Sequence, residues 1–241
     1  MHGRSLERPL VTVPRMVLFA FVLALASQLS LRSQISISMP LGTDLPQAPG
    51  TNTLLGASFG DPIPVAKLLM LYIQTFDYQS TNRTPYQALD YNRLQGWLSQ
   101  ILKLDPFGQY PLMAAAGLYA EVSDETKKRQ MLEFVYQEFF KDPARRWQWL
   151  AHAAAVAKHG LKDLPLARKY AAAIQQHATG DDVPLWAKQM EIFILEDMNE
   201  LEAAKIMIGG YLDKGLIKNP GEMRFLENRL KEIEARMKVK K

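Results

Sequence analysis

The chain has 241 residues, of which 48% are hydrophobic and 22% are charged, and it contains no cysteine. These values exclude a disordered chain and a polytopic membrane protein, and the absence of thiols excludes disulfides, a cysteine nucleophile and a thiolate metal site. The formal net charge is +4, but residues 61–228 carry 19 basic and 21 acidic side chains. Because the basic excess lies at the two ends of the chain, we expect no nucleic-acid partner.

The first predicted element is an apolar helix over Met16–Leu31, a stretch without a charge between Arg15 and Arg32. At about 1.5 Å per residue it is about 24 Å long, slightly short of a bilayer core of about 30 Å. Flanking arginines can reach the two interfaces. Three arginines precede the segment and one closely follows it, which predicts that residues 1–15 are cytoplasmic and that the body lies on the other side of the membrane.

Two other interpretations of this segment stay open. Met16–Leu23 followed by Ala24-Leu25-Ala26 is typical of a cleaved secretory signal, which would give the body the same location. The third interpretation is the buried core helix of a soluble protein, which would then stand isolated before a polar linker. We expect the uncleaved anchor over residues 16–31, because apolar character continues past Ala26.

Prolines and glycines interrupt any periodicity in residues 32–62, which predicts a flexible linker. Residues 63–228 are predicted to be helical throughout, and residues 229–241 to be a frayed basic C-terminal tail. Turn signals divide the helical part into nine expected segments. They are Pro64–Tyr78, Tyr86–Leu104, Tyr110–Glu121, Asp124–Lys141, Arg145–His159, Leu164–His177, Leu185–Asp197, Glu200–Lys214 and Gly221–Lys238. The fold class is therefore all-α.

The turns between these segments recur at a regular step. Asp105-Pro106 is repeated as Asp142-Pro143 and again as Asn219-Pro220, and helices restart after a turn about every 38 residues. A step in this range is typical of stacked antiparallel helix pairs, none of which can bury its apolar face alone.

The units resemble the tetratricopeptide repeat over about residues 110–220, and more weakly over residues 64–104. The residues that carry the resemblance are Trp147, Leu150, Ala154, Ala167, Ala171 and Ile174, and then Trp186, Met190, Ile194, Ala203 and Ile206. No Leu-Gly pair follows the tryptophans, and the step exceeds the usual 34 residues. The resemblance implies an α-solenoid in which Trp186 packs inside its pair against Ala203 and Ile206.

The whole chain is also similar to a family of uncharacterised single-pass inner-membrane proteins of Gram-negative bacteria with such a repeat body. Long phrases carry this similarity, namely those at Ala66–Asp77, Gln109–Val122, Arg145–Ala167 and Trp186–Gly210. The similarity implies a bacterial inner-membrane anchor and a periplasmic body, and it implies no activity.

The side chains that could bind a metal or act in catalysis do not predict a catalytic, metal or cofactor site. His152 and His159 lie two helical turns apart, about 10 Å along the axis, which is too far for one metal ion. The acidic residues between Glu191 and Glu202 are expected at solvated helix termini. The glycine-rich phosphate-binding motifs and the G-x-S-x-G motif are absent from the sequence.

Two functions remain as hypotheses. The first is a membrane-tethered periplasmic interaction module, a scaffold or assembly factor that holds a protein or peptide partner of the cell envelope. Its concave groove is expected to be lined by the first helix of each pair. The expected groove residues are Tyr119, Trp149, His152, Lys158, Lys188, Gln189 and Glu191. The second hypothesis is a periplasmic enzyme that acts on cell-wall glycan, with the solenoid shaping its cleft and a buried carboxylate acting as acid.

Overall fold

The computed structural model describes residues 13–34, 45–77, 86–213, 215, 217 and 219–239. These residues form helices and turns, and no strand is found among them. The all-α prediction is therefore confirmed for the described part of the chain. The chain divides into two compact units, Met1–Thr43 and Asp44–Lys241, which are described separately below.

The first unit contains one described helix, α1 (Arg15–Gln34). Its apolar side chains are exposed around the whole helix, from Met16 to Leu29. No single described helix is both long enough and apolar enough to cross a membrane, because the apolar part of α1 covers only Arg15–Ser30. Taken together, Thr51–Ala57 and Pro62–Phe76 reach that length and composition, but they are bent by 113°. The membrane anchor over residues 16–31 stays a prediction.

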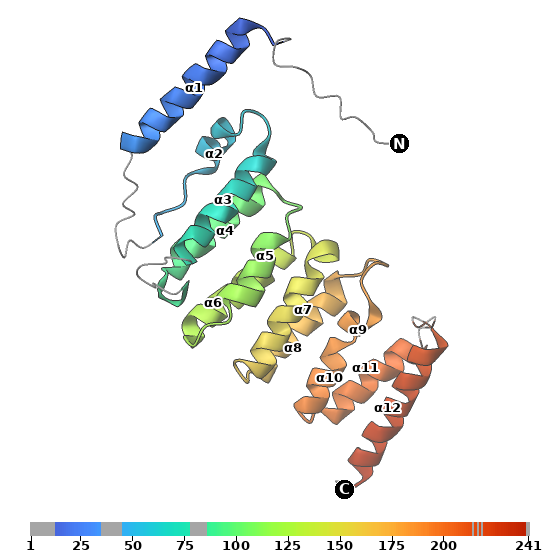
Figure 1. Ribbon diagram of the computed structural model, residues 1–241. Helices are drawn as coiled ribbons and strands as arrows, with labels where there is room; N and C mark the ends of the chain where they lie inside the picture. Colours follow the sequence, from blue (N-terminus) through green and yellow to red (C-terminus); the bar gives the residue numbers. More distant parts are fainter. Residues whose placement is uncertain are drawn as a thin grey trace, which may run out of the picture. The chain divides into compact units, whose positions relative to one another are not determined.

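The second unit is a stack of helices that follow one another in chain order (Figure 1). Its elements are α2 (Thr51–Ala57), α3 (Pro62–Asp77), η2 (Tyr86–Ala88), α4 (Tyr91–Leu104), α5 (Tyr110–Ala114), the π-helical turn η3 (Ala115–Tyr119), α6 (Glu125–Phe139), α7 (Pro143–His159), α8 (Leu164–His177), α9 (Leu185–Lys188), α10 (Met190–Asp197), α11 (Leu201–Asp213) and α12 (Pro220–Val239). Each long helix packs on its neighbours in the sequence: α3 on α4, η3 on α6, α6 on α7, α7 on α8, α8 on α10, α10 on α11, and α11 on α12.

Two kinds of start signal recur along this stack. The helices α4, α6 and α8 each begin after an aspartate whose carboxylate accepts a backbone N–H of the first turn, at Asp90, Asp124 and Asp163. Such a cap satisfies amide groups that have no partner within the helix. The helices α3, α5, α7 and α8 have a proline in the first turn, where its missing N–H costs nothing.

The expected linker is shorter than residues 32–62. Residues 45–57 pack against α4, with Leu45 fully buried and its carbonyl accepting a hydrogen bond from Arg93 Nη1 at 2.9 Å. The indole of Trp97 donates to the Pro46 carbonyl at 2.7 Å, and Thr51 donates to Gln100 at 2.7 Å. These contacts with α4 order a segment whose prolines and glycines predict flexibility. Expected linker residues 35–44 lie outside the described residues.

The helix expected over Gly221–Lys238 is confirmed as α12 (Pro220–Val239), so the segment expected to be a basic C-terminal tail, residues 229–241, is helical as far as Val239. Helix α12 continues to Val239, and Ile233 within it is fully buried. Arg229 and Arg236 both form ion pairs with Glu196 of α10. The basic residues of this segment therefore hold the last helix on the stack.

Buried apolar residues form two clusters. The N-terminal cluster extends from Leu45 through α2–α8 to Ala187, and includes Ile194 of α10. The C-terminal cluster consists of Ile192, Leu195, Leu201, Ala204, Ile208, Tyr211, Ile217, Leu226 and Ile233. Helix α10 contributes to both clusters and joins them.

The residues of the repeat resemblance divide into two groups. In the α7–α8 pair, Leu150, Ala154, Ala167, Ala171 and Ile174 are all buried, as the resemblance implies.

In the next pair the expected packing of Trp186 is wrong. Trp186 is 54% exposed and Ile206 is also exposed, so the two side chains do not form the interior of the pair. The Trp186 ring instead meets the ring of Trp147 edge to face, with centroids 5.5 Å apart. The reason is local: the helix is interrupted at Gln189, between α9 and α10, so the helical periodicity of the sequence does not continue across it.

Candidate functional site

The most apolar cavity described in the body is a groove between α3 and the start of α5. We call it the α3–α5 groove. It has a volume of about 440 Å³ and is lined by Ala66, Lys67, Met70, Leu71, Ile101, Asp105, Gly108, Gln109, Tyr110 and Pro111. Volumes of about 300–1,000 Å³ are usual for binding pockets. The groove is therefore large enough to accept one or two apolar side chains.

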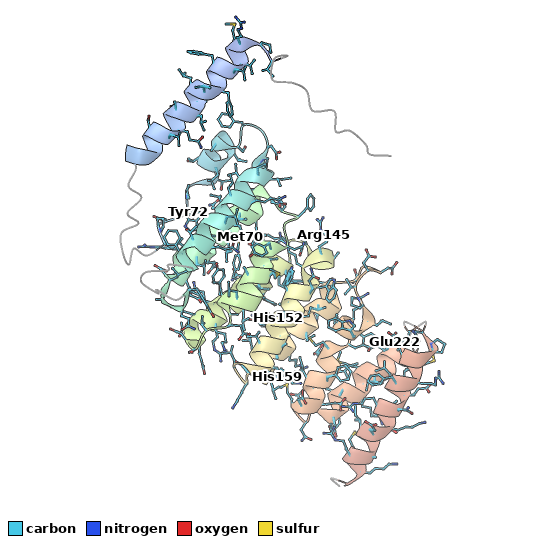
Figure 2. All side chains as sticks on the ribbon, in the orientation of Figure 1. Met70, Tyr72, Arg145, His152, His159 and Glu222 are labelled. Atoms are coloured by element: carbon cyan, nitrogen blue, oxygen red, sulfur yellow. The ribbon has the colours of Figure 1, made fainter. Side chains whose placement is uncertain are left out.

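The floor and the walls of the groove come from different elements. Ala66 and Met70 of α3 and Ile101 of α4 are buried, and they form the floor. Figure 2 shows Met70 within α3, on the part of the helix that lies against the stack. Leu71 and Tyr110 are exposed and form walls, and Gln74 of α3 donates a hydrogen bond to the Tyr110 hydroxyl across the groove. The groove thus combines a preformed floor with accessible apolar walls.

The turn between α4 and α5 forms one edge of the groove. The Gly108 amide donates to the Asp105 carbonyl at 3.1 Å. A Cβ atom at Gly108 would lie 2.9 Å from a carboxylate oxygen of Asp105, so a larger residue here would displace the Asp105 side chain. Arg146 of α7 donates to the Pro106 carbonyl at 3.0 Å and holds the turn against the next pair.

Two residues of α7 continue this surface beyond α5. The indole of Trp149 donates to Gln109 Oε1, which itself lines the groove, at 2.7 Å. His152 is exposed on α7 beside Gly117 of η3, where a Cβ atom would lie 3.9 Å from its Nε2 (Figure 2). Helices α3, α5 and α7 therefore present one connected surface.

Charge on these three helices is one-sided. Helix α7 and the α5–η3 segment contain no acidic residue, and α3 contains only Asp77 at its last position. Basic side chains on the same helices include Lys67, Arg145 and Lys158. The acidic residues of the body lie mainly on α6, α10, α11 and α12 and in the turns.

Of the seven residues expected to line a groove, the structure brings only Trp149 and His152 to this surface. Tyr119 is fully buried, at 0% exposure, and its carbonyl accepts a hydrogen bond from Tyr91 at 2.9 Å. Gln189 is buried at the α9–α10 break. Glu191 is buried and pairs with Arg168 at 3.1 Å. These three side chains are part of the packing of the stack and are not open to a partner.

The two expected lysines make contacts elsewhere. Lys158 forms an ion pair with Asp197 of α10. Lys188 donates to the carbonyls of Thr179 and Gly180, at 3.4 and 3.0 Å. Neither lysine lines the α3–α5 groove. Within the described residues, no group of three or more His, Cys, Asp or Glu side chains could hold a metal ion.

Sequence reasoning missed the contribution of α3 to the groove. Its stretch Ala66–Asp77 contains more apolar residues than one core-facing stripe needs, and Leu68 and Leu71 are left exposed at 63% and 60%. An amphipathic surface helix normally places charged or polar residues at such positions. This surplus of apolar residues in the sequence could have indicated that α3 contributes to a binding surface.

Comparisons with protein-family models, with curated proteins and with solved structures found no match to this chain.

Proposed function

We propose that this protein is a membrane-tethered interaction module of the bacterial cell envelope, in which the α3–α5 groove binds an apolar segment of a protein partner. The observation that carries the proposal is the groove itself, with a volume of about 440 Å³, a buried apolar floor and the exposed walls Leu71 and Tyr110. Contiguous exposed apolar surface on a folded domain marks an interaction site.

The helix stack supports this role. The order of helices packed on their neighbours in the sequence and the buried small residues of α7 and α8 favour a tetratricopeptide-like solenoid. In such a solenoid the first helices of successive pairs form an extended binding surface. The surface over α3, α5 and α7 is of this kind. The hydrogen bond from Trp149 to Gln109 connects α7 to the start of α5.

The tether is supported by α1. Its apolar side chains are exposed on all sides, and a helix that is apolar all round requires burial in a core or in a bilayer. The arginines at positions 4, 8 and 15 favour a cytoplasmic location for its start. The body is then in the periplasm, where the partner is a protein or peptide of the envelope.

No described observation favours the glycan-cleaving enzyme. The buried carboxylates of α10 are engaged in ion pairs: Glu191 with Arg168, and Glu196 with Arg229 and Arg236. A general acid of a glycosidase lies in an apolar pocket and faces the scissile bond, whereas these carboxylates contact arginines within the stack.

The test is site-specific photocrosslinking in cells. The full-length chain carries benzoylphenylalanine in place of Tyr110, which retains an aromatic ring at the groove wall. We expect one discrete crosslinked adduct with an envelope protein. The same residue in place of Phe225, an exposed position on α12, provides the comparison.

Two matched leucines of α3 provide the control. Leu71 lines the groove and Leu68 does not, although both are more than half exposed. Leu71→Lys should abolish the adduct, whereas Leu68→Lys should leave it unchanged, and neither should lower the melting temperature by more than the effect of a surface substitution. If Leu71→Lys leaves the adduct intact, the groove is not the binding site.

A further inference from the structure

A second cavity lies in the body, separate from the α3–α5 groove. It has a volume of about 330 Å³ and is bounded by the end of α4, the turn after α4 and the α6–α7 junction. The residues used below are Ser99 and Lys103 of α4, Phe107 of the turn, Glu138 of α6, and Arg145 and Arg146 of α7. We call it the α4–α7 pocket.

Arg146 is the central residue of the pocket. Its side chain is 3% exposed. Nη1 donates to the carbonyl and the carboxylate of Glu138, at 2.7 and 2.9 Å, and Nη2 donates to the Pro106 carbonyl at 3.0 Å. The Nε–H group is buried and has no hydrogen-bond partner. A buried charged donor without an acceptor costs about 1–3 kcal/mol or more, so this donor requires a partner.

Two more donors of the pocket have no partner within the described chain. Ser99 and Lys103 lie four residues apart on α4, hence on one face of the helix, and both line the pocket. No hydrogen bond or ion pair of the Ser99 hydroxyl or the Lys103 ammonium is found among the described residues. The buried Nε–H of Arg146 and the accessible donors of Ser99 and Lys103 thus line the same pocket.

The acceptors of the pocket are already in use. The two carboxylate oxygens of Glu138 pair with Lys141 at 2.5 Å and with Arg146 at 2.9 Å. Asp142 pairs with Arg145 at 2.5 Å, and the Arg145 guanidinium lies over the Phe107 ring with its carbon 3.9 Å from the centroid. Figure 2 shows Arg145 at the beginning of α7. Four cationic side chains line the pocket against two carboxylates, so its net charge is positive.

We propose that the α4–α7 pocket binds a phosphate group. The planar guanidinium of Arg146 can offer Nε–H to an oxyanion, and Ser99 and Lys103 can donate to its other oxygens. These three donors, one buried without a partner and two accessible to solvent, match the several terminal oxygens of a phosphate better than the two oxygens of a carboxylate. The start of the 17-residue helix α7 lies at the same pocket and adds the positive end of a helix dipole. This proposal does not depend on the proposed function of the α3–α5 groove.

The experiment is a titration of the full-length chain, solubilised in detergent, with inorganic phosphate at constant ionic strength. Calorimetry and the melting temperature are both followed, because a ligand that binds only the folded state raises the melting temperature. We expect saturable binding at one site. Lys103→Gln and Ser99→Ala change partly or fully accessible residues that hold no packing contact, and each should weaken binding, Lys103→Gln by about tenfold.

Two further ligands distinguish the source of the phosphate. Glycerol 3-phosphate represents a small phosphomonoester, and glycerophosphoglycerol represents the diester headgroup of a membrane lipid. Tighter binding of the monoester identifies a soluble phosphorylated compound, and tighter binding of the diester identifies a phospholipid headgroup.

The control variants keep the result interpretable. Lys231→Gln removes an exposed positive charge from α12 and should leave phosphate binding unchanged. Leu71→Lys should also leave it unchanged, which separates this pocket from the α3–α5 groove. The proposal is overturned if none of the three ligands changes the heat signal or the melting temperature, or if Lys103→Gln binds phosphate as tightly as the unmodified chain.

Discussion

The two apolar clusters of the body are held together in different ways. The N-terminal cluster buries large aromatic side chains completely, among them Tyr119, Phe134, Phe139 and Tyr170. The C-terminal cluster contains nine buried residues, of which Tyr211 is the only aromatic one. Around it, ion pairs connect the helices, with Glu196 between Arg229 and Arg236, and Lys205 paired with Glu234.

Because of this difference, we expect the N-terminal cluster to be more stable than the C-terminal cluster. Burial of apolar area contributes about 25 cal/mol per Å² and is not weakened by charge screening, whereas partly exposed ion pairs contribute little and are screened. The last helix of a stack also needs a polar outer face, which α12 provides with its many charged residues. We therefore expect the N-terminal cluster to hold the groove and the pocket in place, and α12 to open most easily.

The largest expected effect is the loss of an aromatic side chain from the N-terminal cluster. Phe134→Ala removes a buried ring of α6 and should lower the free energy of unfolding by about 3–5 kcal/mol, because the cavity collapses only in part. Phe225→Ala removes the same ring from a half-exposed site on α12, where it meets Phe193 with centroids 6.3 Å apart, and should cost only about 0.5–1.5 kcal/mol. Denaturant titrations of both variants compare the two effects. Equal losses would mean that α12 is packed as tightly as α6.

The ion pairs of the C-terminal cluster should have a smaller effect that depends on salt. Glu196→Gln leaves Arg229 and Arg236 without their shared carboxylate and should cost about 1–3 kcal/mol, because the carboxylate is buried while both arginines are partly exposed. The difference from the unmodified chain should shrink as salt is raised. A cost that is unchanged between low and high salt would show that packing, not charge, accounts for the effect.

Trp186 should contribute much less than its position in the repeat pattern implies. It is largely exposed, and its described ring contact is the edge-to-face pair with Trp147. Such pairs are worth about 0.5–1.5 kcal/mol beyond area burial. Thermal melts of Trp186→Ala should therefore show a modest loss. A loss as large as that of Phe134→Ala would place Trp186 in the interior after all.

The smallest predicted effect is a pH dependence at the start of α8. Hydrogen bonds from the Arg129 guanidinium and then the Leu166 amide lower the pKa of Asp163. The unfolded chain, with an Asp pKa of about 3.9, therefore takes up the proton first as the pH falls. The stabilisation is fully present above that pH and is lost as the pH falls through the folded-state pKa. Asp163→Asn should flatten this part of the stability curve measured between pH 6 and pH 2, and an unchanged curve would exclude the contribution.

Local signals made most of the fold predictable. Helix α8 has the predicted bounds, Leu164–His177. Its cap Asp163 directly precedes it, and its apolar periodicity lies within it, so both signals are local in the sequence. Helix α2 was missed for the opposite reason. Its surroundings contain proline and glycine, and it is held by contacts of residues 45–51 with Arg93, Trp97 and Gln100, which lie far along the chain.

The candidate sites were less predictable than the fold. His152 is exposed and Trp149 is partly buried on α7, whereas Tyr119 and Glu191, which helical spacing also put in the groove, are buried. Which face of a helix is covered depends on the neighbouring helices, and one sequence does not determine their rotation. The unpartnered Nε–H of Arg146 likewise becomes visible only when α4, α6 and α7 are brought together.

Hydrogen exchange of the full-length chain, resolved by helix, tests this difference between the two clusters most directly. The account predicts that amides of α11 and α12 exchange through openings of lower free energy than amides of α4, α6, α7 and α8, and that Glu196→Gln lowers the values for α11 and α12 alone. If all helices exchange with one common free energy, and Glu196→Gln lowers it everywhere, the body unfolds as a single unit and the account is contradicted.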